Sequence, residues 1–339
     1  MPCPLPRLFV WGVVGCAAAV WAGAGMLLAA GPDDVVARCG EAPITRGDIW
    51  AVMQRLGTAG LPSGTMRARA EAEVLEQLID ERVLEGELAR LGVVASDADI
   101  DAGLGQLRQQ VANRGDDFEA VLANSGRTLA AIRRQVALEL ALDRYVSPRV
   151  TAAAVAQAFA KHKRDYDGTR LRVSHVLIRP DAGGDGEAAA ELTERAAKLR
   201  GDIVQGRIAF ADAARLHSDG PSRRQGGDLG WIGRDGPMLE PFSNAVFRLS
   251  KGAVSPPFTT PFGVHIVKVT DVQEGRVGID AVRPRLQQRV VSELIRELLV
   301  TGRRRTTVSF EPGTPHLDPL SLEQPAAQRR VVVSEAAGE

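Results

Sequence analysis

The sequence has very few cysteines, only Cys3, Cys16 and Cys39 among 339 residues. This excludes a disulfide scaffold and a cysteine-rich zinc site. Aromatic residues are also scarce, at 4% of the chain, so a core must be built mostly from Ala, Val, Leu and Ile. An excess of charge of either sign is missing, because 42 Lys and Arg balance 42 Asp and Glu. Nucleic-acid-binding proteins usually carry a basic excess, so we expect no nucleic-acid partner.

The composition is otherwise that of a globular protein, with 45% hydrophobic and 25% charged residues. These proportions argue against a disordered chain. At roughly 100–200 residues per domain, the length suggests two or three domains.

The N-terminus contains one long uncharged stretch, residues 8–30, which follows Arg7 and precedes Asp33. Such a stretch can cross a bilayer as a helix, with Arg7 inside and the rest of the chain outside. We therefore expect residues 1–32 to be either a cleaved secretory signal or a retained membrane anchor. Cys16 lies in a lipobox-like context, but the apolar residues after it disfavour lipidation. The chain is then periplasmic, or anchored to the cytoplasmic membrane and facing outward.

Residues 33–166 have the periodicity of helices. After a strand at 35–39 and a turn at 40–43, apolar residues recur at three- and four-residue steps. Thr45 and Ser96 stand where helix N-caps are expected. The predicted helices cover 46–56, 67–91, a segment from 96 on, 116–123, 128–145 and 151–166. The region is therefore predicted to be mainly helical, with no cluster of chemically suggestive side chains.

Residues 169–273 show a different, mixed pattern. Strand-like runs at 171–178 and 264–272 enclose predicted helices at 187–205, 210–217 and 244–249, together with a glycine-rich stretch at 220–236. An amphipathic helix at 280–301 follows, then a strand at 306–310 that we expect to pair antiparallel with 35–39. Residues 277–310 then complete the domain formed by 33–166, and residues 311–339 are predicted to be a disordered tail.

Ordered motifs between residues 173 and 268 carry a family resemblance. They are Val-Ser-His-Val-Leu at 173–177, His-Ser-Asp-Gly-Pro-Ser at 217–222, Gly-Gly-Asp-Leu-Gly-Trp at 226–231, Lys-Gly-Ala-Val-Ser-Pro-Pro at 251–257 and Thr-Pro-Phe-Gly-Val-His-Ile at 260–266. This region resembles the parvulin (PpiC-like) peptidyl-prolyl cis/trans isomerases. The flanking helical regions are similar in layout to exported foldases of the SurA and PrsA type. The resemblance implies an α+β fold, in which a parvulin domain with a small antiparallel sheet is inserted into a mainly helical chaperone-like domain.

The resemblance also implies a site. Met238, Phe242 and Phe262 are expected to line a pocket for the proline ring, and one helical turn would bring the first two together. His175, His265 and Thr260 are expected to form a hydrogen-bonded cluster beneath that pocket. Asp228 is expected to shape its loop. No metal or cofactor is needed, because isomerisation breaks no covalent bond.

One position departs from the family pattern. Parvulins commonly have Cys or Asp where this chain has Gly220, and Asp219 is the adjacent candidate to replace that side chain. The first hypothesis is therefore an isomerase that acts on Xaa-Pro bonds of unfolded or partly folded exported proteins. The alternative is a non-enzymatic chaperone with a degenerate parvulin module. A histidine metal site and a serine protease are disfavoured, since neither a paired-histidine motif nor a nucleophile elbow is present.

Overall fold

The computed structural model describes residues 31–125, 127–180, 189–318 and 331–334. The chain forms two compact units, one made of Met1–Thr151 with Val290–Glu339 and the other of Ala152–Arg289. The predicted signal or anchor lies outside the described residues, except for its last two positions. Among the residues that are described, no helix combines the length and apolarity needed to cross a bilayer.

The first unit joins the two ends of the chain through a small sheet. Strands β1 (Val35–Cys39), β2 (Ala42–Thr45) and β7 (Val308–Phe310) lie in the order β2-β1-β7. The predicted pairing is confirmed, since β7 runs antiparallel to β1 with Ala37 opposite Phe310. The expected turn at 40–43 is shorter than predicted, because β2 already begins at Ala42.

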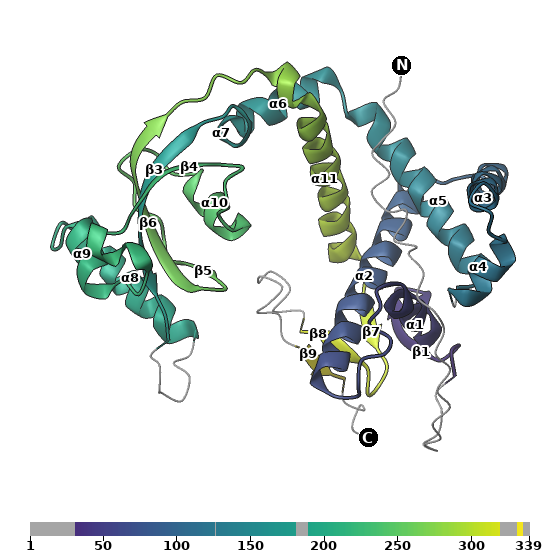
Figure 1. The fold of residues 1–339 in the computed structure, drawn as a ribbon. Helices are drawn as coiled ribbons and strands as arrows, with labels where there is room; N and C mark the ends of the chain where they lie inside the picture. The colour runs from purple at the N-terminus through teal and green to yellow at the C-terminus, as the bar shows by residue number, and fades with distance from the viewer. Residues whose placement is uncertain (1–30, 126, 181–188, 319–330, 335–339) are drawn as a thin grey trace. The chain divides into compact units, whose positions relative to one another are not determined.

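Among the described residues before 150, five helices follow β2, and the first two of them pack against this sheet (Figure 1). They are α1 (Arg46–Arg55), α2 (Thr65–Arg90), α3 (Asp97–Ala112), α4 (Phe118–Asn124) and α5 (Leu129–Val146), followed by the 3-10 turn η1 (Ser147–Arg149). N-terminal capping boxes explain where two of these helices begin. Thr45 and Asp48 form a capping box on α1, and Ser96 and Asp99 form one on α3. Each box satisfies backbone N–H groups that lack a partner in the first helical turn.

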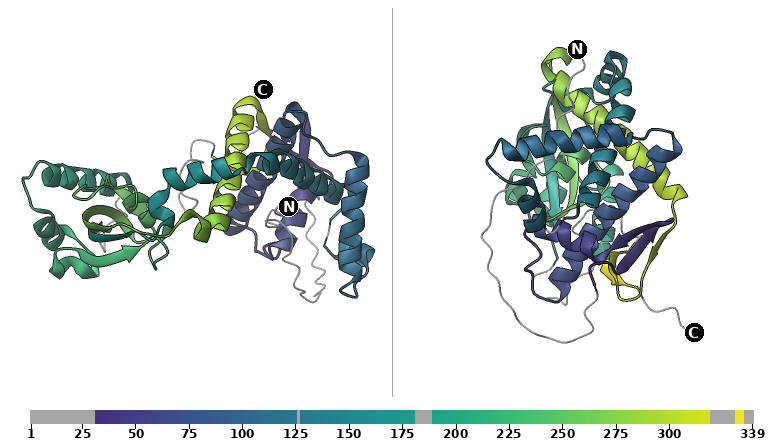
Figure 2. Two further views of the ribbon diagram at one scale, coloured as in Figure 1. Left: turned by 90° about the horizontal axis from the view of Figure 1, so that it is seen from above. Right: turned by 90° about the vertical axis from the view of Figure 1, so that its right-hand side faces the viewer.

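The end of α11 (Ile279–Arg305) supplies the missing side of this core, and Figures 1 and 2 show it beside α2. Leu298 packs with Leu84 and Leu88 of α2 in one buried cluster. Arg303 adds ion pairs to Glu76, at 2.6 Å, and to Asp80. Segments distant in sequence therefore share one core, as the hydrophobic pattern predicted.

The prediction of a disordered tail is wrong at two places. Strand β8 (Pro315–Leu317) pairs antiparallel with β9 (Val331–Val333). The hydroxyl of Thr314 donates to the Val36 carbonyl at 3.1 Å, and His316 stacks on Phe310 at 3.8 Å between ring centroids. These stabilising contacts come from distant residues, which local composition does not reveal. Residues 319–330 and 335–339 lie outside the described part.

The second unit begins with α6 (Ala152–Lys161) and α7 (Lys163–Tyr166), where one continuous helix was predicted. His162 interrupts it with a non-helical backbone (φ −119°, ψ 28°). The boundaries between the two units fall at 151/152 and 289/290. From the sequence, the inserted parvulin unit was expected to begin near Tyr166 and to end near Gly275.

A four-stranded antiparallel sheet forms the centre of this unit, in the order β4-β3-β6-β5. Its long strands β3 (Arg170–Ile178) and β6 (Gly263–Gln273) were predicted. The edge strands β4 (Asp228–Gly233) and β5 (Phe258–Thr260) were missed, because glycines and prolines surround them. Both are short and depend on the central strands for their hydrogen bonds.

Helices cover both faces of the sheet. One face packs on α8 (Ala189–Val204) and α9 (Phe210–His217) through residues such as Val176, Ile266 and Phe210. The other face packs on α10 (Glu240–Val246) through Val173, Val267 and other residues. Helix α10 starts earlier than the predicted 244–249, since Pro241 is well tolerated in a first helical turn. The 3-10 turn η2 (Pro221–Gln225) lies between α9 and β4.

Candidate active site

The two central strands bring His175 and His265 together. In the antiparallel register of β3 and β6, Leu177 pairs with His265 and His175 pairs with Val267. The imidazole centroids are 5.7 Å apart, with 29° between the ring planes. Both side chains are buried, with exposed fractions of 6% and 4%. The predicted histidine pair is therefore a stacked pair inside the domain.

Thr260 joins this pair from β5. Its Oγ1 lies 2.7 Å from Nε2 of His265 and also accepts a hydrogen bond from the Phe262 amide at 3.1 Å. Among the described residues, Nδ1 and Nε2 of His175 and Nδ1 of His265 are buried without a hydrogen-bond partner. The expected cluster is thus hydrogen-bonded only between Thr260 and His265, while the two histidines meet by stacking.

Both imidazoles are held neutral. Burial lowers the pKa of His175 below its ordinary value. The pKa of His265 is lowered from 6.5 to about 4, first by burial, then by His175, whose own proton would repel a second one nearby, and by Arg179. A neutral imidazole can donate one hydrogen bond and accept one, so the site offers polar atoms without a net charge.

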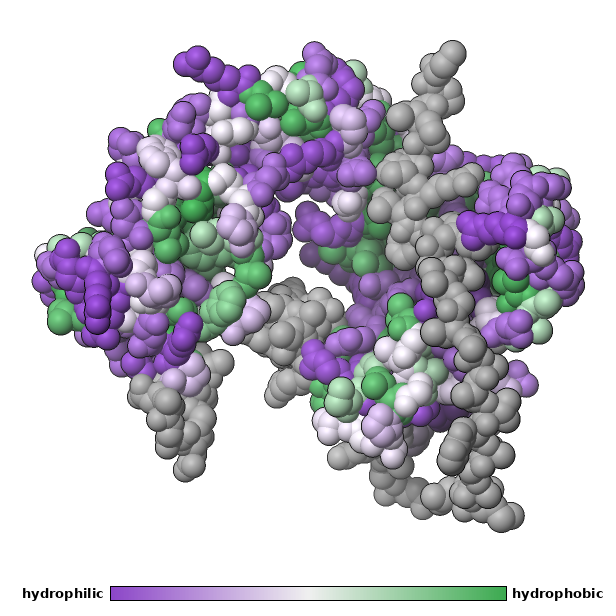
Figure 3. All heavy atoms as spheres, viewed as in Figure 1, coloured by the Kyte–Doolittle hydropathy of each residue, from purple (hydrophilic) through white to green (hydrophobic). Residues whose placement is uncertain are grey.

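Phe242 forms the apolar side of the site. Its ring meets the ring of His265 edge-on at 5.6 Å and that of His175 at 6.3 Å. Only 5% of Phe242 is exposed, and Met238 packs against the same cluster while half-buried. The expected helical turn between these two residues is absent, because Met238 precedes α10, whose N-cap is Leu239. In Figure 3 apolar residues gather over α10 and β5.

The sequence prediction missed Phe258. Its ring stacks on His265 at 5.5 Å and 15°, and touches Phe242 edge-on at 5.8 Å. Strand alternation starting from Thr260 would have identified Phe258, because residues two apart in a strand lie on the same face of the sheet. Phe262, by contrast, lies past the end of this strand and is 59% exposed.

The loop after α9 approaches His175 from another direction. The buried Ser218 Oγ accepts hydrogen bonds from the amides of Leu177 and Gly220, both at 3.1 Å. Asp219 points elsewhere, since its carboxylate accepts a hydrogen bond from the Arg179 amide at 2.9 Å. Gly220 is therefore the residue that faces His175, and Asp219 is fixed at the end of β3.

Asp228 stabilises the turn after this loop. Its carboxylate accepts hydrogen bonds from Arg172 at 2.7 Å and from the Gly230 amide at 3.0 Å. Gly227 has a positive φ of 83°, and a Cβ there would stand 2.3 Å from the His175 carbonyl. The close approach of this loop to β3 therefore requires glycine.

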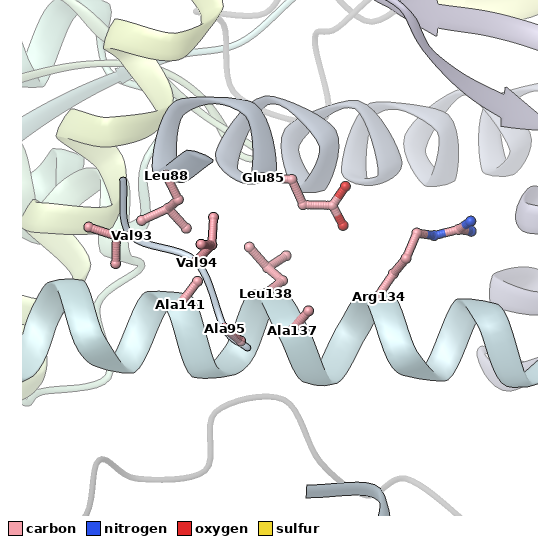
Figure 4. A pocket seen from close by; sticks show the side chains of 9 residues that line it. All are labelled: Glu85, Leu88, Val93, Val94, Ala95, Arg134, Ala137, Leu138 and Ala141. Carbon is pink, nitrogen blue, oxygen red and sulfur yellow. The ribbon is translucent and has the colours of Figure 1, made fainter. Parts of the chain in front are cut away.

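The first unit holds a separate pocket of about 170 Å³ between α2 and α5 (Figure 4). Its apolar end is lined by Leu88, Val93, Leu138 and Ala141, and its charged end by Glu85 and Arg134. Burial is the main cause that raises the pKa of Glu85. Across the described ranges, no group of three or more His, Cys, Asp or Glu side chains is arranged to hold a metal ion.

Known families match both units. The model of the PPIC-type PPIase domain matches residues 175–271, and that of the SurA-like N-terminal domain matches residues 6–146. Foldase protein PrsA of Bacillus subtilis is 29% identical over 267 residues, which cover 79% of this chain and 77% of that protein. Chaperone SurA of Vibrio cholerae is 30% identical, over 59% of this chain and 47% of its own.

The chain thus spans about half the length of that SurA relative. A solved structure of PrsA from Bacillus anthracis aligns over 68% of this chain and 96% of its own, with 22% identity and a TM-score of 0.36. The two family matches fall on the regions that the sequence separated by pattern, and together they span most of the chain. The chain therefore combines a SurA-like N-terminal domain with a PPIC-type PPIase domain, and in this it is similar to the PrsA and SurA foldases.

Proposed function

We propose that this chain is an active peptidyl-prolyl cis/trans isomerase that assists the folding of exported proteins. The observation that carries the proposal is the pair of neutral, buried imidazoles beside Phe242, with Thr260 bonded to one of them. Three imidazole nitrogens there have no partner among the described residues, so they are available to a bound peptide after a small movement.

The chemistry requires little more than binding. Rotation about a peptide bond has a barrier of about 18–20 kcal/mol, which arises from amide resonance. A catalyst lowers this barrier when it binds the twisted amide more tightly than the planar one. In our proposal Met238, Phe242 and Phe262 hold the proline ring, which anchors one end of the rotating bond.

The polar side chains of the site act on the amide at the other end of the rotating bond. In this proposal His175 and His265 present hydrogen-bonding nitrogens toward the amide, and Thr260 fixes the His265 ring through the 2.7 Å contact. Asp219 contributes indirectly, because its bond to the Arg179 amide anchors the loop that carries Gly220. No proton leaves the peptide and no covalent intermediate forms.

A second function, client binding without catalysis, is favoured by Gly220. With glycine there, no side chain from this loop reaches a bound amide. The apolar end of the pocket between α2 and α5 gives such a chaperone a place to hold an apolar client side chain. Client binding at this pocket alone would not exclude isomerase activity, because the pocket and the histidine site lie in different units.

The location of the chain follows from the same proposal. Unfolded exported proteins are met beyond the cytoplasmic membrane, and the uncharged residues 8–30 suit either a signal or an anchor. Fractionation of producing cells, with N-terminal sequencing of the mature chain, distinguishes the two.

The deciding experiment is an exchange assay on the full chain. NMR exchange spectroscopy with a panel of Xaa-Pro peptides measures the cis/trans rate directly. We expect a faster rate with the wild-type chain and a large loss in the His265→Gln variant. A folded wild-type chain that leaves every peptide unaccelerated, yet still suppresses aggregation of an unfolded protein, supports the non-enzymatic chaperone instead.

A further inference from the structure

The imidazole of His265 lies between two other rings. His175 stacks on it at 5.7 Å and 29°, and Phe258 at 5.5 Å and 15°. Both partners are nearly parallel to it, and no ring contact joins Phe258 to His175 among the described residues. Strand β6, which carries His265, lies between β3 and β5, so the two partners flank the imidazole from opposite sides.

Strand β5 produces this arrangement through its register. Phe258 is the cross-strand partner of His265, so their side chains leave the sheet on the same face. Thr260 stands two residues further along and bonds Nε2 of the same ring. One short strand thus holds His265 at two points, by the ring of Phe258 and by the hydroxyl of Thr260.

Phe258 also contacts Phe242, which forms the apolar side of the site. Its ring meets Phe242 edge-on at 5.8 Å, with 68° between the planes. Phe242 in turn meets His265 edge-on. Three aromatic rings therefore enclose this imidazole, and the charge-bearing or titratable groups that act on it are His175 and Arg179.

We propose that Phe258 is a positioning residue for His265, whose stacked ring fixes the plane of that imidazole and keeps water from its outer face. The proposal rests on the proposed function for its catalytic consequence, but the positioning itself is a separate property. Aromatic pairs contribute about 0.5–1.5 kcal/mol beyond the area they bury. Loss of the ring lets water reach that face, which favours the charged imidazole and raises the proton affinity of His265.

Three variants of the full chain test this. Phe258→Leu removes the ring and keeps an apolar side chain, and Phe258→Tyr keeps the ring. Phe210→Leu is the matched control, because Phe210 is buried in the same unit on the opposite face of the sheet. The readouts are the NMR titration and ring-proton shifts of His265, with the Xaa-Pro exchange rate measured alongside.

We expect Phe258→Leu to raise the pKa of His265, move its ring-proton signals and slow exchange about threefold to tenfold, while Phe258→Tyr resembles the wild type. An unchanged His265 titration and unchanged ring signals in a folded Phe258→Leu chain, or equal changes in Phe210→Leu, overturn the proposal. Should His265 respond as expected while the wild-type chain accelerates no peptide, positioning is supported and the isomerase function fails.

Discussion

Gly220 lies so close to His175 that a Cβ atom on the glycine would stand 2.9 Å from Nε2 of the histidine. The loop is held at this distance by Ser218, whose hydroxyl accepts the Gly220 amide hydrogen. The backbone of Gly220 is ordinary, with φ −79° and ψ 156°. Glycine is therefore needed for space, and the edge of His175 occupies the room that a larger side chain would take.

The first prediction follows from this contact. Gly220→Ala and Gly220→Asp should destabilise the chain by about 1–3 kcal/mol, because the added atoms overlap a buried ring. Neither should raise the Xaa-Pro exchange rate. Gly278→Ala is the control, since a Cβ there meets nothing within 4 Å. Denaturant unfolding and the exchange assay measure both effects; a faster Gly220→Asp enzyme of normal stability would show that the site merely lacks a side chain.

Removal of the Thr260 hydroxyl should weaken catalysis. Thr260→Val leaves Nε2 of His265 and the Phe262 amide without their partner, and the loss at the buried His265 nitrogen costs about 1–3 kcal/mol. Thr260→Ser retains the hydroxyl and should restore most of the rate. The measurement is the Xaa-Pro exchange rate, with the nitrogen shifts of His265 to report its tautomer. Equal rates for the Val and Ser variants would argue against a role for this hydroxyl.

The stability of the chain should decrease in mild acid because of His265. Its pKa is about 4 in the folded chain and near 6.5 when unfolded, so the unfolded state binds the extra proton between these values. The free energy of unfolding then falls as the pH drops from 6.5 to about 4, and His265 contributes no further change outside this window. Denaturant titrations at several pH values should give a shallower slope for His265→Gln than for the wild type. Parallel slopes would contradict the lowered pKa.

Met238 should matter more for activity than for folding. It is half-buried beside Phe242, so Met238→Ala removes apolar surface from the proposed pocket without leaving a large internal cavity. Loss of most of this contact corresponds to roughly a tenfold slower exchange. Leu239→Ala, at the exposed neighbouring position, provides the control. If Met238→Ala loses stability and activity in proportion, the residue belongs to the core.

The shared core of the first unit predicts a long-range effect. Leu298 of α11 is 3% exposed and packs on Leu84 and Leu88, so Leu298→Ala should cost about 2–5 kcal/mol. Val300→Ala on the same helix should cost little, because Val300 is 45% exposed. Hydrogen exchange should show lost protection in α2 and β1, with residues 169–273 unaffected. Full protection of α2 and β1 in Leu298→Ala would disprove the shared core.

The sequence predicted the elements with long periodicity and the pairing of β1 with β7, but it missed several other short strands. Helix α5 and strands β3 and β6 have enough residues for a regular apolar pattern. Strands β5 and β8 have three residues each, which is too short for a recognisable apolar pattern. Their hydrogen bonds arise from tertiary contacts, so local composition predicted only loop or disorder there.

The site, too, was predicted only in part, because some of its contacts depend on the tertiary fold. The family resemblance pointed to His175, His265, Thr260 and Phe242, which the fold places side by side, while their roles in catalysis stay a prediction. It did not reveal that Asp219 bonds the Arg179 amide or that Phe258 stacks on His265. Both facts depend on how strand ends and edge strands are aligned, which spacing along one chain does not specify.

The pairing of β1 with β7 determines the order in which this protein can fold as it is synthesised. Every strand of the second unit exists once Gln273 has been made, whereas β1 pairs with β2 alone until Val308–Phe310 have followed. A chain that emerges N-terminus first therefore completes the inserted unit before the unit that encloses it. Until then Leu84 and Leu88 of α2 lack Leu298, so the nascent chain carries an open apolar surface. During synthesis the chain therefore exposes apolar side chains, as do the unfolded proteins that its proposed function would assist.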